Sequence, residues 1–146
     1  MHAEAPDRAL LDRLERYYDA VPRTGAQVEA HGPFTIFVPK GGFPLYARPR
    51  LGFATAITAD DVRAVTDRQR ALGVPQAIEW VHETTPSLAE AAKSLGFTVL
   101  ELPLLVLRDP AEAPAPSGVV VRRIQSDEPE LTRILAVAAV AFGHAG

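Results

Sequence analysis

The chain has 146 residues, of which 47% are hydrophobic, and a formal net charge of −3 at pH 7. This length is enough for one domain with its own core, and the acidic balance lacks the basic footprint of a nucleic-acid-binding protein. The absence of cysteine excludes disulfides, thiolate nucleophiles and sulfur-ligated zinc. The longest apolar run, residues 135–142, is too short to cross a membrane. We therefore expect a cytoplasmic protein with neither a nucleic-acid nor a membrane partner.

The first third of the chain predicts a helix followed by three short strands. Apolar residues recur at helical spacing over residues 10–18, and this helix is expected to end before Pro22. Residues 27–30, 34–38 and 44–47 are β-like runs separated by Gly- and Pro-rich segments typical of hairpins. We expect these three runs to form an antiparallel meander.

A second helix is predicted over residues 59–72. Thr58 is suited to cap its first turn, and Asp61 has the position that completes a shortened capping box. Gly73 is expected to close the helix, since glycine readily adopts the left-handed conformation found after helix C-termini.

The next segments predict strands that alternate with a helix. Residues 77–82 are expected to form a strand, Thr85 to cap a helix over residues 86–95, and residues 97–107 to form another strand, bent at Pro103. The complete order predicts an α/β (α+β) domain with a mixed, largely antiparallel central sheet flanked by helices.

The composition changes after this domain. Residues 109–117 are rich in Pro and Ala, which predicts a semi-rigid linker. A strand is expected over residues 119–124 and a helix over 127–142, with an apolar face formed by Leu131, Ile134, Leu135, Ala138 and Phe142. We therefore expect a domain over 1–108, a linker over 109–117, and the first strand and helix of a second, truncated domain over 118–146. The apolar face predicts contact with a missing carboxy-terminal domain or with a second copy in a homodimer.

Several segments resemble the GNAT superfamily of acetyl-CoA-dependent N-acyltransferases. Residues 77–97, with the sequence AIEWVHETTPSLAEAAKSLGF, resemble the strand, helix and Gly-Phe step of that family. Residues 119–124 and the helix after them are similar to the elements with which GNAT domains usually open, and residues 43–52 and 58–65 look like the amino-terminal half of two-domain members. The resemblance implies a GNAT-like fold, acetyl-CoA as the cofactor and a small-molecule or other amine as the acceptor.

The segment that corresponds to the cofactor-binding loop departs from the family pattern. GNAT enzymes hold the pyrophosphate with backbone N–H groups of a Gln/Arg-x-x-Gly-x-Gly/Ala loop that leads directly into a helix. Gly52 and Ala54 have this spacing and Arg50 lies beside them, so these three are the candidate cofactor-binding residues. However, Pro49 replaces the Gln or Arg, and residues 55–58 separate the loop from its helix. These departures imply that this chain does not bind acetyl-CoA.

A candidate substrate-binding cluster lies at the end of the strand expected over residues 77–82. Its members are Glu79, Trp80, His82 and Glu83, at the carboxyl end of a central strand, where open α/β sheets usually place ligands. The alternative is structural, with Trp80 filling the core and the other three serving as wall or surface residues. No metal site is predicted, because the four histidines lack ligand spacing.

The resemblance also bears on catalysis. Many family members place a Tyr four residues before the Gly of the Gly-Phe step to protonate the leaving thiolate, whereas this chain has Ala92 there. We assign no catalytic residue, and we expect a degenerate GNAT-like half of an N-acetyltransferase with a scaffold or substrate-lid role. Two alternatives remain: an active acyltransferase with a nonstandard pyrophosphate loop around Gly52 and Ala54, and a non-enzymatic interaction module that dimerises.

Overall fold

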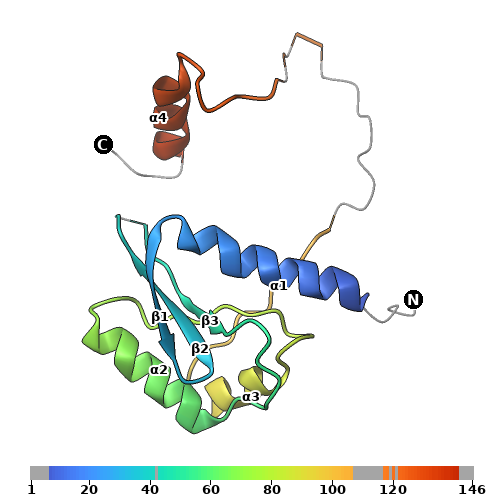
Figure 1. Ribbon diagram of the computed structural model, residues 1–146, viewed down its shortest axis with the longest axis vertical. Helices are drawn as coiled ribbons and strands as arrows, with labels where there is room; N and C mark the ends of the chain where they lie inside the picture. The colour runs from blue at the N-terminus through green and yellow to red at the C-terminus, as the bar shows by residue number, and fades with distance from the viewer. Residues whose placement is uncertain (1–6, 42, 107–116, 119, 121, 142–146) are drawn as a thin grey trace. The chain divides into compact units, whose positions relative to one another are not determined.

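The computed structural model describes two compact units, residues 1–102 and 103–146, each of which is considered by itself. The described residues are 7–41, 43–106, 117–118, 120 and 122–141. Over these residues the first unit contains three helices and a three-stranded antiparallel sheet, and the second unit contains one helix (Figure 1). The α+β class expected from the sequence is therefore confirmed.

Helix α1 spans Arg8–Arg23 and begins at Asp7, whose carboxylate accepts a hydrogen bond from the Ala9 N–H at 2.9 Å. The expected end before Pro22 is wrong, because the last turn includes Pro22 and continues to Arg23. Proline removes one N–H donor from a helix. In this position its ring is buried, and the following Thr24 N–H closes the turn on the Val21 carbonyl at 3.3 Å.

The expected meander is confirmed. Strands β1 (Ala26–His31) and β2 (Phe34–Pro39) are antiparallel, and β2 also pairs antiparallel with β3 (Ala47–Pro49). Gly32 has φ +54° in the tight turn between β1 and β2, a conformation that glycine adopts readily. The third strand lies later than the expected 44–47, since its ladder with β2 begins at Ala47 and ends at Pro49.

The strands expected after the meander are reduced or absent. In the expected strand 77–82, only Ile78 forms a bridge, parallel to Ala47, with hydrogen bonds from Ala47 N to Ala77 O at 2.9 Å and from Glu79 N to Ala47 O at 3.0 Å. Residues 97–106 contain no strand, and residue 107 lies outside the described part of the chain. The mixed sheet expected from the sequence is thus an antiparallel sheet with one parallel bridge.

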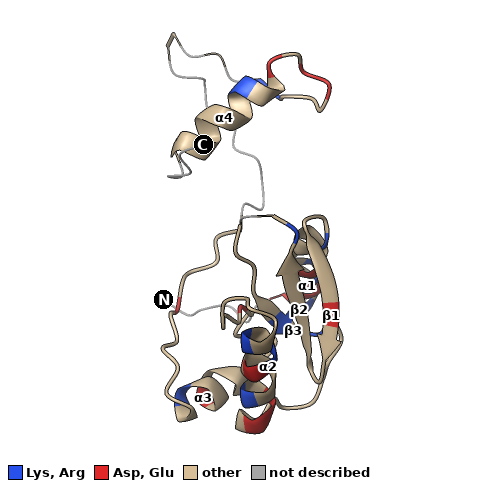
Figure 2. Cartoon of the chain, turned by 90° about the vertical axis from the view of Figure 1, so that its left-hand side faces the viewer, with Lys and Arg blue, Asp and Glu red and all other residues tan. Residues whose placement is uncertain are grey.

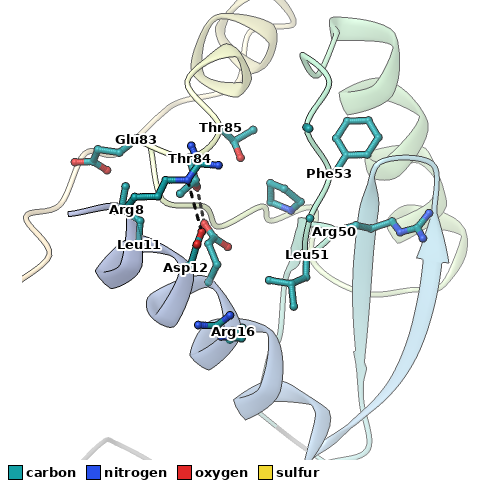
Figure 3. Close-up of a pocket in the computed structure, with 14 residues that line it drawn as sticks. Arg8, Leu11, Asp12, Arg16, Arg50, Leu51, Phe53, Glu83, Thr84 and Thr85 are labelled. Atoms are coloured by element: carbon teal, nitrogen blue, oxygen red, sulfur yellow. Dashed lines mark hydrogen bonds and ion pairs between the residues drawn. The ribbon is translucent and has the colours of Figure 1, made fainter. Parts of the chain in front are cut away.

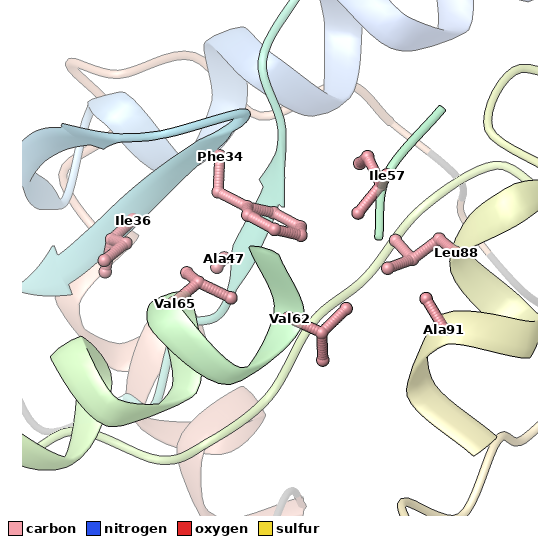
Figure 4. Packing of buried hydrophobic residues seen from close by; sticks show 8 residues of the cluster. All are labelled: Phe34, Ile36, Ala47, Ile57, Val62, Val65, Leu88 and Ala91. Carbon is pink, nitrogen blue, oxygen red and sulfur yellow. The ribbon is translucent and has the colours of Figure 1, made fainter. Parts of the chain in front are cut away.

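The alternation of β2 places helices on both faces of the sheet. Phe34 and Ile36 point to one face, where they join a fully buried core with residues of α2 and α3 (Figure 4). Phe37 points to the opposite face, where the guanidinium of Arg23 in α1 lies 5.9 Å from its ring centroid. The first unit therefore has three layers: α1, the sheet, and the pair α2 and α3. The core cluster comprises Phe34, Ile36, Ala47, Ile57, Val62, Val65, Leu88 and Ala91.

Helix α2 spans Ala59–Ala71 and begins with the capping box predicted from the sequence. The Asp61 N–H donates to the Thr58 hydroxyl at 3.2 Å, and the Thr58 N–H donates to the Asp61 carboxylate at 2.9 Å. Gly73 follows the helix with φ +69°, as expected for its role in closing it. Charged residues of both signs line α2 (Figure 2).

Helix α3 spans Ser87–Ser94, within the expected range of 86–95. The expected cap at Thr85 is wrong: Pro86 takes the N-cap position, and no side chain caps the first turn. The Ser87 hydroxyl instead accepts a hydrogen bond from the Ile57 N–H at 3.0 Å. This contact ties the start of α3 to the segment that leads into α2.

The second unit contains α4, which spans Leu131–Ala141 rather than the expected 127–142. Residues 126–130 form turns before it, and the Arg122 guanidinium pairs with Glu128 at 2.7 Å. The expected strand over 119–124 is not observed at residues 120 and 122–124, and Val119 and Val121 lie outside the described residues. On the expected apolar face, Leu131 and Ile134 are half-buried, Leu135 and Ala138 are exposed, and Phe142 lies outside the described part.

The linker expected over 109–117 falls almost wholly outside the described residues, which include only its last position, Ser117. Among the helices that the structure describes, none combines the length and the apolar character needed to span a membrane.

The capping box gives a direct test of the fold. Replacing Thr58 with Ala removes the acceptor for the Asp61 N–H, and we expect a loss of about 1 kcal/mol in the free energy of unfolding. Urea denaturation of the full chain measures this loss. Thr98→Ala, at an exposed position outside any helix or strand, is the matched control and should change stability by less than about 0.5 kcal/mol. Equal effects of the two substitutions would contradict the role of the capping box.

Candidate functional site

A groove in the first unit lies between α1, the loop after β3 and the turn before α3 (Figure 3). Its volume is about 490 Å³, within the range of 300–1,000 Å³ common for small-ligand sites. Its walls are formed by Arg8, Leu11, Asp12, Glu15 and Arg16 of α1, by residues 49–54, and by Glu83, Thr84 and Thr85.

The three candidate cofactor-binding residues, Arg50, Gly52 and Ala54, all line this groove. The Arg50 side chain points away from it (Figure 3) and donates to the Gly32 carbonyl at 3.4 Å. The Arg50 N–H donates to Pro33 O at 2.8 Å, and the Phe53 N–H donates to Arg50 O at 2.9 Å. Two backbone N–H groups of the loop, those of Arg50 and Phe53, are therefore already hydrogen-bonded within the protein.

The helix after this loop is also unsuited to an anion. Four residues, 55–58, separate the loop from the first residue of α2, Ala59. A free helix N-terminus attracts phosphate through unpaired N–H groups and the helix dipole. In α2 the carboxylates of Asp60 and Asp61 occupy the first turn, and Asp61 closes the capping box with Thr58. The Asp60 charge is compensated by an ion pair with Arg63, whereas the Asp61 carboxylate occupies the capping position that an incoming pyrophosphate would need.

Of the four residues of the candidate substrate cluster, only one lines the groove. Glu83 lines the groove and is exposed, whereas Glu79, Trp80 and His82 do not line it. Trp80 packs against the core cluster, and its buried Nε1 has no hydrogen-bond partner among the described residues. His82 is exposed. The structure thus joins Glu83 to the loop around Gly52, a juxtaposition that the sequence analysis did not anticipate.

A buried polar network behind the groove was missed in the sequence analysis. The Arg48 side chain is 3% exposed and donates to the Glu15 carboxylate at 3.0 Å. The second carboxylate oxygen of Glu15 accepts a hydrogen bond from the Thr84 hydroxyl at 2.6 Å. The Arg48 guanidinium also lies 4.8 Å from the centroid of the Tyr18 ring, a favourable cation–π distance. This network connects α1, β3 and the turn before α3.

A weak sequence signal for this network existed. Thr35 and Arg48 are cross-strand partners, so their side chains lie on the same face of the sheet, the face opposite Phe34 and Ile36. That face receives α1, where Glu15 stands among apolar residues at helical spacing. The register between β2 and β3 was needed to combine these observations.

The pKa of Glu79 is raised next to this network. Glu79 is exposed as a residue, and partial desolvation of its carboxyl group is the main cause of the raised pKa, while the Arg48 charge and a hydrogen bond with Tyr46 act in the opposite direction without cancelling it. The pKa of the Tyr46 hydroxyl is also raised, first by burial and then by the negative charge of Glu79. The Glu79 carboxyl therefore stays protonated to a higher pH than the carboxyl of an isolated glutamate.

The groove combines apolar surface with charged groups of both signs. Such a lining can bind a polar organic molecule, and within the described residues no group of three or more His, Asp or Glu side chains is placed to hold a metal ion. Comparison of the chain with protein-family models, with curated proteins and with solved structures gave no match. The functional argument therefore depends on the residues themselves.

Removal of Arg48 tests the network. Arg48→Met leaves the Glu15 carboxylate without its ion-pair partner, and we expect a loss of about 3 kcal/mol or more in the free energy of unfolding, measured by chemical denaturation. The matched control is Arg70→Met, which removes an exposed ion pair with Asp67 and should change stability by less than about 1 kcal/mol. Combining Glu15→Gln with Arg48→Met should recover part of the loss. Equal losses for Arg48→Met and Arg70→Met would show that the buried pair is unimportant.

The hydrogen bond between Glu79 and Tyr46 gives a prediction about the pKa of the Glu79 carboxyl. Tyr46→Phe removes a hydrogen bond that lowers the pKa of Glu79, so the pKa should rise further above its ordinary value. A carbon-detected NMR titration of the Glu79 carboxyl, in the wild-type chain and in the variant, measures both values. A lower or unchanged pKa in Tyr46→Phe would contradict the assignment.

The same shift predicts a pH dependence of stability. Because the folded-state pKa is raised above 4.5, the folded chain binds more protons than the unfolded chain between the two values, and the contribution of Glu79 to stability is lost as the pH rises through that interval. Glu79→Gln should remove this contribution. Unfolding free energies measured at successive pH values should therefore fall less steeply for the variant than for the wild type.

Proposed function

We propose that this chain is the non-catalytic, GNAT-like half of a two-domain, acetyl-CoA-dependent N-acetyltransferase, in which it acts as a scaffold or substrate lid. The order of its elements supports this proposal. A helix, three antiparallel strands, a helix, a segment that bridges β3 in parallel, and another helix follow one another in the first unit. Among the segments that resemble the family, residues 58–65 lead into and form the first part of α2, and residues 77–97 contain the bridge to β3 and α3.

The loop at 49–54 is the observation that carries the non-catalytic role. In the family this loop supplies backbone N–H donors to the cofactor pyrophosphate. Here Pro49 has no N–H, and the Arg50 and Phe53 N–H groups are bonded to Pro33 and Arg50 carbonyls. The loop then continues into residues 55–58 rather than into a helix. This arrangement favours a half that does not hold the cofactor.

The position of the family's proton donor supports the same conclusion. Ala92 lies on α3 and is buried, and its carbonyl accepts hydrogen bonds from the Leu95 N–H at 3.1 Å and the Phe97 N–H at 3.2 Å. A methyl group cannot protonate a thiolate. In the enzyme that we propose, the acceptor amine forms a bond to the acetyl carbonyl carbon, the carbon–sulfur bond breaks, and the residues that move the protons belong to the other half.

A scaffold or substrate lid must contact another domain or a second chain. The first unit has exposed apolar side chains that suit such a contact. Leu100 is 79% exposed and Leu102 is 83% exposed, in a segment that is neither helix nor strand. Exposed apolar groups of this size are common at interfaces. They favour a partner domain, or a second copy of the chain, over an isolated ligand-free module.

Calorimetric titration with acetyl-CoA tests the proposal. We expect no binding in the micromolar range, which corresponds to about 8 kcal/mol of binding free energy. The Pro49→Gln variant should not bind either, because residues 55–58 and the Asp61 carboxylate remain in place. Micromolar binding by the wild-type chain, abolished by Gly52→Val, would instead support an active acyltransferase with a nonstandard pyrophosphate loop.

A further inference from the structure

Strand β1 is an edge strand of the sheet. Within the described residues it pairs with β2 only, and it lies along the right-hand border of the first unit in Figure 2. Its register with β2 is continuous over all six residues, and its sequence, AQVEAH, contains neither Pro nor Lys. Bulges, prolines and unpaired charges are the usual features that keep an edge strand from pairing with another chain. A bulge and a proline are thus both missing from β1.

The backbone groups on the free side of β1 belong to Val28 and Ala30. The Phe37 N–H of β2 donates to the Tyr46 carbonyl at 3.2 Å, on the β3 side of the sheet. Phe37 and Val28 are cross-strand partners, so the N–H and C=O of Val28 point away from β2, and by alternation those of Ala30 do the same. Both residues are exposed, and no described residue bonds to these groups. Ala26 has the same orientation but is only 4% exposed, so it is closed to a partner strand.

The acidic residue of β1 is neutralised from the neighbouring helix. The Arg68 guanidinium of α2 donates to both carboxylate oxygens of Glu29, at 2.7 and 2.8 Å, and both side chains remain partly exposed. A bare carboxylate in the middle of an edge strand would repel an identical strand placed against it. The ion pair removes this repulsion, because a copy related by a two-fold axis presents its own positive and negative ends in the opposite direction.

We propose that a second copy of this chain pairs antiparallel with β1, so that the two three-stranded sheets form one continuous sheet. With Ala26 closed, the register with the most hydrogen bonds places Val28 opposite Ala30 of the second copy, and Ala30 opposite its Val28. Each of these two pairs exchanges two backbone hydrogen bonds. The same register places the two Glu29 residues opposite each other, so the dimer needs Arg68 in both copies. This inference goes beyond the proposed function, because it concerns an interface of this half itself and involves neither cofactor nor acceptor.

Sedimentation equilibrium of the full chain tests the proposal. The mass should approach twice the 15.7 kDa of one chain, with a dissociation constant of about 100 μM or lower. Arg68→Gln exposes two facing carboxylates and should weaken association at least about tenfold, and adding Glu29→Gln should restore it. The matched control is Arg63→Gln, which removes an exposed ion pair with Asp60 from the same helix and should associate like the wild type.

Hydrogen exchange locates the interface without a substitution. The amides of Val28 and Ala30 should exchange more slowly as the concentration of the wild-type chain rises, whereas the amide of the exposed Thr98 should not. Circular dichroism spectra verify that the variants retain their helices. The proposal is overturned if the wild type is a monomer at about 100 μM, if Arg68→Gln associates like Arg63→Gln, if Glu29→Gln does not restore association, or if the two β1 amides show no protection. A dimer that persists in Arg68→Gln would place the contact elsewhere, for example on the exposed apolar side chains of α4. Since acetyl-CoA is absent from these measurements, their outcomes are distinct from a failure of the proposed function.

Discussion

The ion pair between Arg48 and Glu15 is the interaction on which the first unit depends. A guanidinium that is only 3% exposed is strongly unfavourable without a partner, so α1 must lie where Glu15 reaches it. The same carboxylate accepts the Thr84 hydroxyl and thereby fixes the turn before α3. One side chain therefore positions α1 against β3 and against that turn. The groove has these elements as its walls, and its shape follows from this one carboxylate.

The network also determines which charges are available for binding. Glu15 lines the groove, but its charge is compensated by Arg48 from the sheet side, and the Tyr18 ring shields the guanidinium further. The carboxyl of Glu79 is influenced by the same guanidinium, which lowers its pKa but does not outweigh burial. We infer that the buried Arg48 and its partner Glu15 act structurally.

Some local features of this fold could be read from the sequence, although the expected Thr85 cap and the expected end of α1 before Pro22 were wrong, and contacts between distant residues could not be read from it. The capping box of Thr58 and Asp61 involves residues three positions apart, and its two hydrogen bonds follow from helix geometry alone. Arg48 meets a partner 33 residues away, and Thr84 meets that partner across 69 residues. Strand propensity was likewise insufficient over residues 77–82, because a strand needs a neighbour along its length and β3 provides one only near Ile78.

The start of α2 connects the stability of the fold with the proposed loss of cofactor binding. The first N–H groups of a helix need acceptors, which a protein can supply from its own side chains or leave for a bound anion. In this chain Thr58 and Asp61 supply them, and Asp60 adds a second negative charge to the first turn. A helix that carries its own anion is stable without ligand, but it repels a pyrophosphate. The capping box that stabilises α2 therefore uses helix N–H groups that a pyrophosphate would need, which supports the proposed loss of cofactor binding.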